Sequence, residues 1–401
     1  MSVVRGVTAE AEIVRACARP SLEPGIAARL DALLGSAVDW PRVLRLAERH
    51  GLVPLVHHHL ASRGTAVPAS VGDELRSRAR AVAGQNLMMT GELLRIVDRL
   101  ESRGIPVIPY KGPALGLVAY GSLALRSFAD LDLLIPRADV VEAKRLLLDD
   151  GYRPLYRLGP AEEAAYLRSE CEYMLERGPV RVELHWQILP RYFSVPLDVD
   201  GFWTRTAVAS LAGATVRTLA PEDLLLALSA HATKHCWDRL ELVASFAAVI
   251  RRHPGMDWTA LREAAARAGA RRLLDVGLWL ARELIELELP PAVMDDRVAG
   301  ALAQEVARKL LAEDPAVLDW TDQVRFHLRA RERSADRLRY LLRLATTQTV
   351  DDWQLVALPS RTGGLYRIIR PLRLLGKFGP LALARMLPAL AEGRDGHERS
   401  A

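Results

Sequence analysis

The sequence predicts an α+β protein in which a small β-sheet core lies between two helical regions. Over most of the 401 residues, apolar side chains recur every three or four positions, which is the spacing of one helix face. Between residues 104 and 218 this spacing gives way to short apolar runs and alternating stretches, which are typical of strands. Because 50% of the residues are hydrophobic, the chain can bury a substantial core.

We divide the chain into four parts by residue range. They are an N-terminal helical region at 1–103, an α/β core at 104–218, a C-terminal helical region at 219–391, and a tail expected to be disordered at 392–401. In the first part, Asp39 precedes Trp40-Pro41 as a helix cap does. Ser70 opens the longest helix that we expect, which ends at Gly104.

The core is predicted to alternate between strands and helices. An apolar run that contains Pro106 and Pro109 indicates one strand, and the alternation of DLDLLI indicates another. Two stretches on either side of Gly178-Pro179 indicate a hairpin. The expected elements are a strand at Ile105–Tyr110, helices at Ala114–Tyr120 and Asp139–Asp149, a strand at Asp130–Ile135, and hairpin strands at Glu172–Arg177 and Val180–Trp186.

Helical spacing returns after Pro221 and continues to near the end of the chain. The run from Pro221 to Arg252 is interpreted as helical, and Asp257 is expected to cap the next helix. The stretch 361–391 mixes basic and apolar residues and contains Gly and Pro. It fits either a solvated helix face or a surface that contacts a membrane or an anionic partner.

Composition limits the partners and the compartment. The net charge of +5 fits an anionic ligand such as a nucleotide, but it is too weak to indicate duplex DNA, so a nucleic-acid partner stays open. The cysteines Cys17, Cys171 and Cys236 are too far apart in the sequence to suggest a disulfide framework or a cysteine zinc cluster. With no signal peptide and no run as long as a membrane span, we expect a soluble, cytoplasmic protein without a transmembrane segment.

Asp130 and Asp132 form the motif that first suggests a chemical role. Residues two apart in a strand project from the same face, so the carboxylates lie side by side, about 6 to 7 Å apart at the backbone. Two like charges held together need a cation, and hard oxygen ligands suit Mg²⁺ or Mn²⁺. Metal binding is therefore the favoured interpretation, and a strand-edge or helix-capping role is the alternative.

Glu183 and His185 occupy one face of the strand VRVELHW by the same alternation. If this strand pairs beside the one that holds the two aspartates, Glu183 completes a cup of three carboxylates that can hold two metal ions. The alternative for Glu183 is a solvent-facing position in an ordinary two-faced strand. His185 is interpreted as a packed or hydrogen-bonded neighbour rather than as a catalytic group.

Lys111 and Gly112 lie at the turn from the first strand into a helix, where phosphate binding is expected. Glycine lets the backbone approach a phosphate, the helix N-terminus offers free N–H groups, and lysine adds a full positive charge. Pro113 removes one N–H group, which leaves those of Gly112 and Ala114 beside the Lys111 side chain. The alternative for Lys111 is an exposed turn residue.

Two further cations are candidate ligands of the nucleotide. Arg126, four residues before Asp130, either clamps phosphate or pairs with that aspartate. His231 and His235 lie four apart on one helix face beside Lys234, without the glutamate of an H-E-x-x-H zinc motif. Lys234 is therefore the candidate phosphate or acceptor contact of this helix.

The motifs KGPAL, DLDLLI, VELHW and HATKHCWDRL follow one another in this order. In their order and spacing, the chain resembles the uncharacterised nucleotidyltransferase family of the polymerase-beta-like nucleotidyltransferase superfamily, over roughly 30–289. The resemblance implies a nucleotidyltransferase-type mixed β-sheet core with helical flanks. Gly112, the pair of Asp130 with Asp132, and Glu183 match the superfamily's turn glycine, D-x-D pair and later carboxylate. Similar proteins often carry an acidic residue near Ser245, where none is evident in this sequence.

These observations lead to the hypothesis of an EC 2.7.7-type nucleotidyltransferase, which moves an NMP from an NTP such as ATP to an acceptor and releases pyrophosphate. The expected catalytic residues and ligands of Mg²⁺ or Mn²⁺ are Asp130, Asp132 and Glu183, and the expected nucleotide-binding residues are Lys111, Gly112, Arg126 and Lys234. The acceptor (small molecule, peptide, protein or RNA), the preferred NTP and the oligomeric state stay open. The alternatives are a non-catalytic nucleotide-binding regulatory or scaffold protein, and a toxin-like transferase that acts on RNA.

Overall fold

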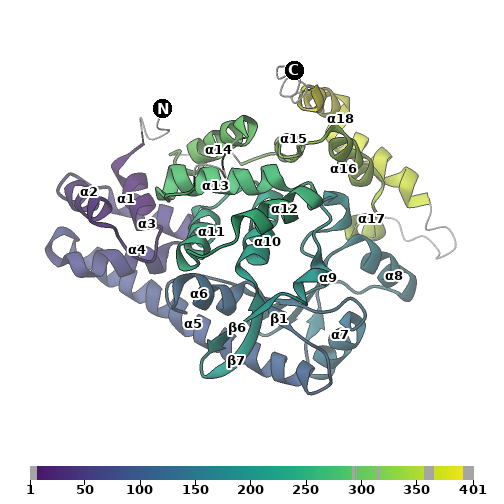
Figure 1. The fold of residues 1–401 in the computed structure, drawn as a ribbon, viewed down its shortest axis with the longest axis horizontal. Helices are drawn as coiled ribbons and strands as arrows, with labels where there is room; N and C mark the ends of the chain where they lie inside the picture. Colours follow the sequence, from purple (N-terminus) through teal and green to yellow (C-terminus); the bar gives the residue numbers. More distant parts are fainter. Residues whose placement is uncertain (1–6, 291–293, 295, 314–316, 356–364, 392–401) are drawn as a thin grey trace.

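The computed structural model describes residues 7–290, 294, 296–313, 317–355 and 365–391 (Figure 1). The predicted α+β class is confirmed, because helices surround a small mixed sheet built from the middle of the chain. The tail 392–401, expected to be disordered, lies outside the described residues. The division of the chain into four parts stays a prediction.

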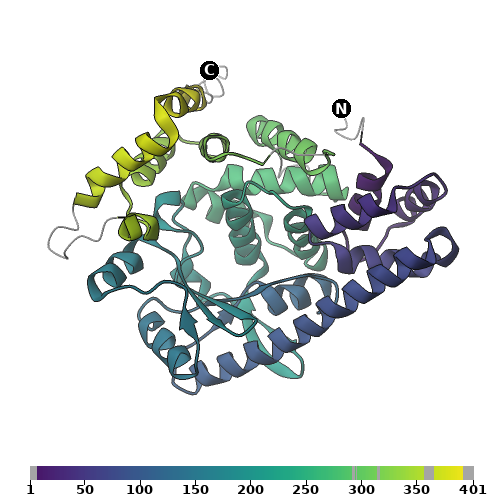
Figure 2. The ribbon, with the colours of Figure 1, turned by 180° about the vertical axis from the view of Figure 1, so that it is seen from behind.

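The N-terminal part is helical, as predicted. Its elements are α1 (Ala9–Cys17), α2 (Pro24–Leu34), α3 (Trp40–Arg49), α4 (Val53–Leu60), the 3₁₀ helix η1 (Ala61–Ala66) and α5 (Ala69–Glu101). Asp39 caps α3, since its side chain accepts a hydrogen bond from the backbone N–H of Arg42. With 33 residues, α5 is about 50 Å long and runs beneath both the N-terminal helices and the sheet (Figures 1 and 2).

Five strands form the central sheet in the order β1-β2-β5-β4-β3. They are β1 (Ile108–Pro109), β2 (Asp130–Leu134), β3 (Arg153–Pro154), β4 (Glu172–Arg177) and β5 (Val180–His185). β2 and β5 run parallel, whereas the other neighbours are antiparallel, so the sheet is mixed. The helices between these strands are α6 (Gly112–Tyr120), α7 (Val140–Asp149) and α8 (Pro160–Ser169).

The two faces of the sheet differ in chemistry because side chains alternate along each strand. Leu131, Leu133, Val182 and Leu184 are fully buried in the hydrophobic cluster that also takes in α5 and α7. The opposite face carries the acidic residues of β2, β4 and β5. The apolar face therefore fixes the register that brings the acidic side chains together.

Two parts of the core differ from the prediction. The first strand has two residues instead of the six expected at Ile105–Tyr110, because Pro106 and Pro109 have no N–H group to donate to a neighbouring strand. A second, two-stranded sheet, β6 (Thr206–Leu211) with β7 (Ala214–Leu219), was not predicted. It follows the 3₁₀ helix η2 (Arg191–Phe193) and the short helix α9 (Val199–Phe202).

The C-terminal part is helical. Its elements are α10 (Pro221–Lys234), α11 (Leu240–Arg252), α12 (Trp258–Ala268), α13 (Arg271–Ile285), α14 (Arg297–Leu310), α15 (Trp320–Arg329), α16 (Ser334–Thr346), α17 (Val350–Leu355) and α18 (Tyr366–Ala391). Asp257 caps α12 as predicted, accepting from the N–H of Ala260. The run Pro221–Arg252 is not one helix, since the backbone turns at Cys236 and Trp237, both with φ of +53°. Figure 1 shows α10 and α11 between the sheet and α13.

Part of the basic C-terminal stretch is buried, whereas Arg367 and Lys377 of the same stretch are exposed, so the interpretation as a solvated helix face does not hold for the whole stretch. Arg370 is 5% exposed, and its guanidinium lies 2.9 Å from Asp352, which is itself fully buried. Arg373 pairs with the same aspartate at 2.8 Å. These two residues join α18 to α17 rather than facing solvent or a membrane. None of the helices that the described residues form combines the length and the hydropathy needed to cross a membrane.

Candidate active site

The register of β2 and β5 places the predicted carboxylates on one face of the sheet. Asp132 lies directly opposite Glu183, and Asp130 lies opposite Arg181. In a parallel pair, residues directly opposite each other project to the same side, so Asp130, Asp132 and Glu183 share the polar face. The pairing on which the predicted cup depended is therefore present.

A tight group forms within this face, and it includes a residue that the sequence did not favour. Ligand atoms of Asp132, Glu183 and His185 all lie within 4.8 Å of one another. The Nε2 atom of His185 is 3.2 Å from Asp132 Oδ1 and 3.3 Å from Glu183 Oε2. Asp130 lines a cavity together with Asp132 and Glu183, but it does not belong to this tight group. His185 is thus a central contact of the cup.

Two cations compensate the charge of Asp132, which is 2% exposed. The Lys111 ammonium forms an ion pair with Asp132 Oδ1, and His185 contacts the same atom. Burial alone would raise the pKa of Asp132, but Lys111 and His185 hold it below its usual range. Lys111 is only 7% exposed, which excludes an exposed turn residue, the alternative considered for it.

His185 is held in its charged form by acidic neighbours on both sides of its ring. Although burial opposes the charge, Glu172 and Asp132 raise the pKa of His185 well above its usual value. Its Nδ1 atom lies 3.1 Å from Glu172 Oε2, while Nε2 faces Asp132. The imidazolium therefore connects β4 to the two carboxylates on β2 and β5.

Asp130 differs electrostatically from its neighbour Asp132. Burial and the charge of Asp132 raise the pKa of Asp130 to about 6. The two carboxylates of one D-x-D motif thus have pKa values shifted in opposite directions, because Lys111 and His185 contact Asp132 and not Asp130.

The turn between β1 and α6 requires glycine at position 112. Gly112 has φ of +53°, and a Cβ atom there would lie 3.1 Å from the backbone oxygen of Asp130. The turn therefore packs directly against β2. The N–H groups of Gly112 and Ala114, in the first turn of α6, have no partner within the helix, whereas Pro113 has no N–H group.

Residues of α10 and the segment after it form the opposite wall of the site. A cavity of about 240 Å³ lies between this wall and the acidic face, and it is lined by His231, Lys234, His235 and Arg239 together with the predicted carboxylates. Although burial opposes the charge, Cys171 and Glu172 raise the pKa of Lys234. Burial and the charge of Lys234 lower the pKa of His235 to about 4, so its ring is neutral.

Arg126 does not pair with Asp130, which was one of the two interpretations of this residue. Its Nε atom donates to Glu241 Oε1 at 2.9 Å and to Ser245 Oγ at 3.3 Å, so the expected pair with Asp130 is not formed. Glu241 also accepts from Ser245 at 2.8 Å. The statement that no acidic residue lies near Ser245 was wrong, because Glu241 precedes it by one helical turn on the same face of α11. The Arg126 NH1 atom is buried without a hydrogen-bond partner among the described residues.

Glu172 is the other acidic residue of the site that the sequence did not single out. It lies opposite His185 in the β4–β5 pair. The signal was present, because Glu172 belongs to a predicted hairpin strand whose alternation sets it on the face of Glu183 and His185. The sequence did not show which residue of β5 lies opposite Glu172 in the hairpin.

The fold and this site define a nucleotidyltransferase-type protein. A mixed sheet presents carboxylates on two adjacent parallel strands, beside a glycine turn that opens a helix. Residues 36–286 match the family model described as uncharacterised nucleotidyltransferase, and this match covers more than half of the chain. The chain therefore belongs to the uncharacterised nucleotidyltransferase family. Comparison with curated proteins gives no match, and comparison with solved structures gives none.

Proposed function

We propose that this protein is an EC 2.7.7-type enzyme that transfers a nucleoside monophosphate from an NTP to a hydroxyl group of an acceptor. The acceptor oxygen would bond to the α-phosphorus, the bond from that phosphorus to the bridging oxygen would break, pyrophosphate would leave, and the hydroxyl proton would pass to water. The observation that carries the proposal is the side-by-side position of Asp132 and Glu183 on parallel strands, with Asp130 in the same cavity.

The donor set of the cup fits a hard divalent cation, Mg²⁺ or Mn²⁺. The Oδ2 atom of Asp132 is buried and makes no hydrogen bond among the described residues, so one carboxylate oxygen is available as a ligand. Asp130, Asp132 and Glu183 would hold the cation. Once bound, it would neutralise charge on the triphosphate and make the acceptor hydroxyl more acidic.

The chain's own cations would position the triphosphate. Lys111 lies beside Asp132, and the N–H groups of Gly112 and Ala114 open α6 next to it. From the other wall, Lys234 and Arg239 line the cavity. Arg126, whose NH1 atom has no hydrogen-bond partner in the part of the chain that the structure describes, lines it from the segment before β2. These donors would hold the phosphates in line with the acceptor.

A neighbouring cavity of about 380 Å³ is proposed as the acceptor site. It shares Glu172 with the cavity of the cup, and its other walls come from the segment around β4 and α8, from η2 and from the C-terminal helices. Aromatic side chains line much of it, namely those of Tyr156, Tyr166, Tyr192, Trp320 and Tyr340. Since α15, α16 and α18 lie beyond the family match at 36–286, acceptor choice would depend on a part of the chain that the family model does not cover.

The test is transfer of label from each α-labelled NTP, with Mg²⁺ or Mn²⁺, into a small-molecule extract, a protein fraction and total RNA. Asp132→Asn is expected to reduce transfer by at least about 100-fold, because it removes an oxygen ligand. Glu176→Gln is the matched control, since Glu176 lies on the same face of the sheet but is exposed and outside the cavity. Equal labelling by the wild type and by Asp132→Asn would remove the proposal.

A second candidate is a non-catalytic nucleotide-binding protein, and one observation favours it. Lys111 already neutralises Asp132, so the site has a stable arrangement that needs no metal. Calorimetry that detects Mg²⁺-dependent NTP binding without release of pyrophosphate would support this candidate.

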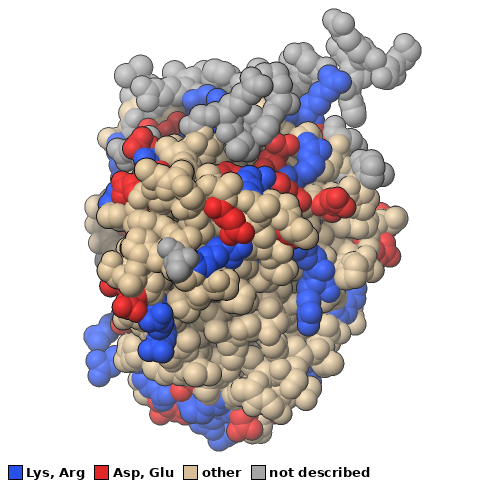
Figure 3. All heavy atoms as spheres, turned by 90° about the vertical axis from the view of Figure 1, so that its left-hand side faces the viewer, with Lys and Arg blue, Asp and Glu red and all other residues tan. Residues whose placement is uncertain are grey.

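For the toxin-like RNA transferase, Figure 3 offers no support on the face that it draws, where described basic and acidic side chains are intermixed around a largely uncharged centre.

A further inference from the structure

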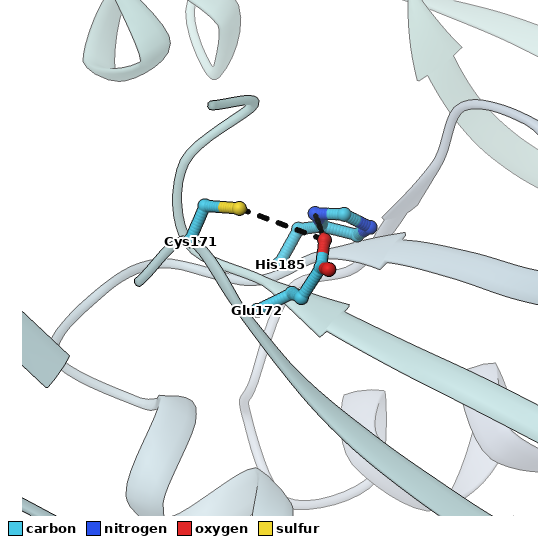
Figure 4. A group of neighbouring side chains, drawn as sticks. All are labelled: Cys171, Glu172 and His185. Carbon is cyan, nitrogen blue, oxygen red and sulfur yellow. Dashed lines mark hydrogen bonds and ion pairs between the residues drawn. The ribbon is translucent and has the colours of Figure 1, made fainter. Parts of the chain in front are cut away.

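Three side chains with metal-binding atoms converge at the junction of β4 and β5. Cys171, which precedes β4, and Glu172, the first residue of β4, point toward His185 at the end of β5 (Figure 4). The Cys171 sulfur is 3.6 Å from Glu172 Oε2, and His185 Nδ1 is 3.1 Å from the same oxygen. Ligand atoms of all three lie within 4.8 Å of one another. One ion could contact all three after small adjustments of these side chains.

A second observation points to a ligand at this place. His185 is 2% exposed, and its Nδ1 atom makes no hydrogen bond among the described residues. The 3.1 Å contact of Nδ1 with Glu172 Oε2 lacks hydrogen-bond geometry. A metal ion bound between these two atoms, in place of the proton that Nδ1 carries in the imidazolium, would satisfy both of them. Cys171 is also buried, with its sulfur beside the same carboxylate.

The donor set selects the class of ion. A thiolate, an imidazole nitrogen and a carboxylate oxygen are the ligands of Zn²⁺, whereas Mg²⁺ prefers oxygen alone. Three protein ligands leave a fourth position open, and Glu172 lines both the cup cavity and the proposed acceptor cavity, so an ion has a route inward. This set is distinct from the all-oxygen donors of Asp130, Asp132 and Glu183.

We propose that Cys171, Glu172 and His185 form a binding site for Zn²⁺ or a similar transition-metal ion, next to the carboxylate cup. A histidine that binds a metal through one ring nitrogen commonly donates its other N–H to a carboxylate, which fixes the ring. His185 has this arrangement, with Nδ1 in the group and Nε2 at 3.2 Å from Asp132. Occupancy of the site would therefore hold the orientation of Asp132. This link to the cup rests on the proposed function, but the metal site itself does not.

The test uses the full chain without nucleotide. Co²⁺ serves as a spectroscopic probe, because a cobalt–thiolate bond gives an intense charge-transfer band that oxygen ligands do not give. We expect this band in the wild type, its displacement by Zn²⁺, and one Zn²⁺ bound per chain. We expect Cys171→Ser to lose the band and to weaken Zn²⁺ binding by more than about 100-fold, and Glu172→Gln to weaken it by roughly 10-fold or more.

Cys236→Ser is the matched control. Cys236 is buried and lies 3.6 Å from a ring nitrogen of His327, so it too is a cysteine beside a histidine. Both nitrogens of His327 already have partners, namely Tyr340 and the backbone oxygens of Thr233 and Lys234. This variant is expected to keep the cobalt band.

Two results would overturn the metal site. One is the absence of a thiolate band in the wild type, which does not depend on the folding of any variant. The other is a band that survives in Cys171→Ser and disappears in Cys236→Ser. A failure of the proposed function would look different, because NMP transfer would be absent while the cobalt band and the Zn²⁺ stoichiometry would remain.

Discussion

The side chain of Asp132 shows how charge is balanced in the cup. Its buried carboxylate contacts the ammonium of Lys111 and the imidazolium of His185. Removing one partner of a buried ion pair leaves an uncompensated charge, which costs more than the pair itself contributes. The protein should therefore be more stable with both Lys111 and Asp132, or with neither of these charges, than with one of them alone.

The first prediction concerns this pair. Lys111→Met is expected to lower the free energy of unfolding by about 3 to 5 kcal/mol, because Asp132 then lacks its closest cation. The double variant with Asp132→Asn should recover most of this loss. Denaturant unfolding of the single and double variants measures the effect. Lys144→Met, which breaks the partly exposed pair with Glu163, should cost about 1 kcal/mol or less. Equal losses for the two lysine variants would contradict the prediction.

The second prediction concerns Asp130, whose pKa is raised to about 6 from the ordinary value of 3.8. A carboxyl group with a raised pKa favours the folded state below its unfolded pKa, and this contribution is lost as pH rises through about 6. At pH 8 without divalent metal, Asp130→Asn is therefore expected to raise the free energy of unfolding by about 1 to 2 kcal/mol.

The difference between Asp130→Asn and the wild type should shrink as pH falls from 6 and vanish well below the ordinary pKa of 3.8, where the carboxyl is protonated in both states. Unfolding curves recorded across this range provide the measurement. A difference that does not change with pH would show that Asp130 is not the group whose ionisation is penalised.

The third prediction concerns Gly112. Gly112→Ala places a side chain at φ of +53° and a Cβ atom 3.1 Å from the backbone of Asp130. The expected loss of stability is about 1 to 3 kcal/mol, because both the left-handed backbone and the close approach are unfavourable. Thermal unfolding measures it. Gly84→Ala in α5 is the control, since open space surrounds that position, and it should be neutral or stabilising.

Individual site residues were predictable where local periodicity decides their direction. Asp130 with Asp132, and Glu183 with His185, follow from alternation along one strand each. The pairing of Arg126 with Glu241 was not predictable, because 115 residues separate them and the contact depends on how α11 packs against the segment before β2. The direct contact of His185 with two carboxylates likewise required the register between strands.

Among the elements, the predictions succeeded where the periodic pattern was long and strong. The helix α5, the strand β2 and the β4–β5 hairpin appear within three residues of the expected ends. The β6–β7 hairpin was missed because its strands consist largely of small and exposed residues. Its turn places Ala212 at φ of 50°, without the Asn-Gly or Asp-Gly sequence that signals such a turn.

The fourth prediction concerns the ion pair between Arg126, in the segment before β2, and Glu241 of α11. Glu241→Ala removes the acidic partner of Arg126 and is expected to cost about 3 to 5 kcal/mol, since the buried guanidinium is left without its counter-charge. Glu263→Ala is the control, because Glu263 forms an exposed pair with Arg267 at 3.7 Å and should cost less than about 0.5 kcal/mol. Chemical denaturation compares them. A loss for Glu241→Ala no larger than that of the control would contradict a structural role for this pair.

At the scale of the whole molecule, two hydrophobic clusters meet around the site. One cluster surrounds the sheet with α5 and α7, and the other contains the N-terminal helices together with α10, α11 and α13. The strands that carry the acidic residues pack their other, apolar face into the first cluster, whereas Lys234 of the opposite wall belongs to α10, a helix of the second cluster. No single segment of the sequence contains this cavity, which is why the sequence predicted its residues but not its walls.

The fifth prediction follows from the origin of the two cavity walls in different segments of the sequence. Mg²⁺ with a non-hydrolysable NTP analogue is expected to slow amide hydrogen exchange both in 110–135 and in 228–245, because both walls would contact the ligand. Helix α2, which does not line this cavity, should exchange at an unchanged rate. Hydrogen-exchange mass spectrometry measures all three. Protection confined to the sheet would exclude the proposed contacts of Lys234 and Arg239.

The ion pair between Lys111 and Asp132 has a consequence for the order in which ligands bind. A divalent cation at Asp132 has to compete with an ammonium ion that is tethered to the protein, so the apparent affinity for the free cation is reduced by that competition. The displaced ammonium gains a new partner only when a triphosphate is present. Cation and nucleotide should therefore bind cooperatively, each strengthening the affinity for the other by the same factor.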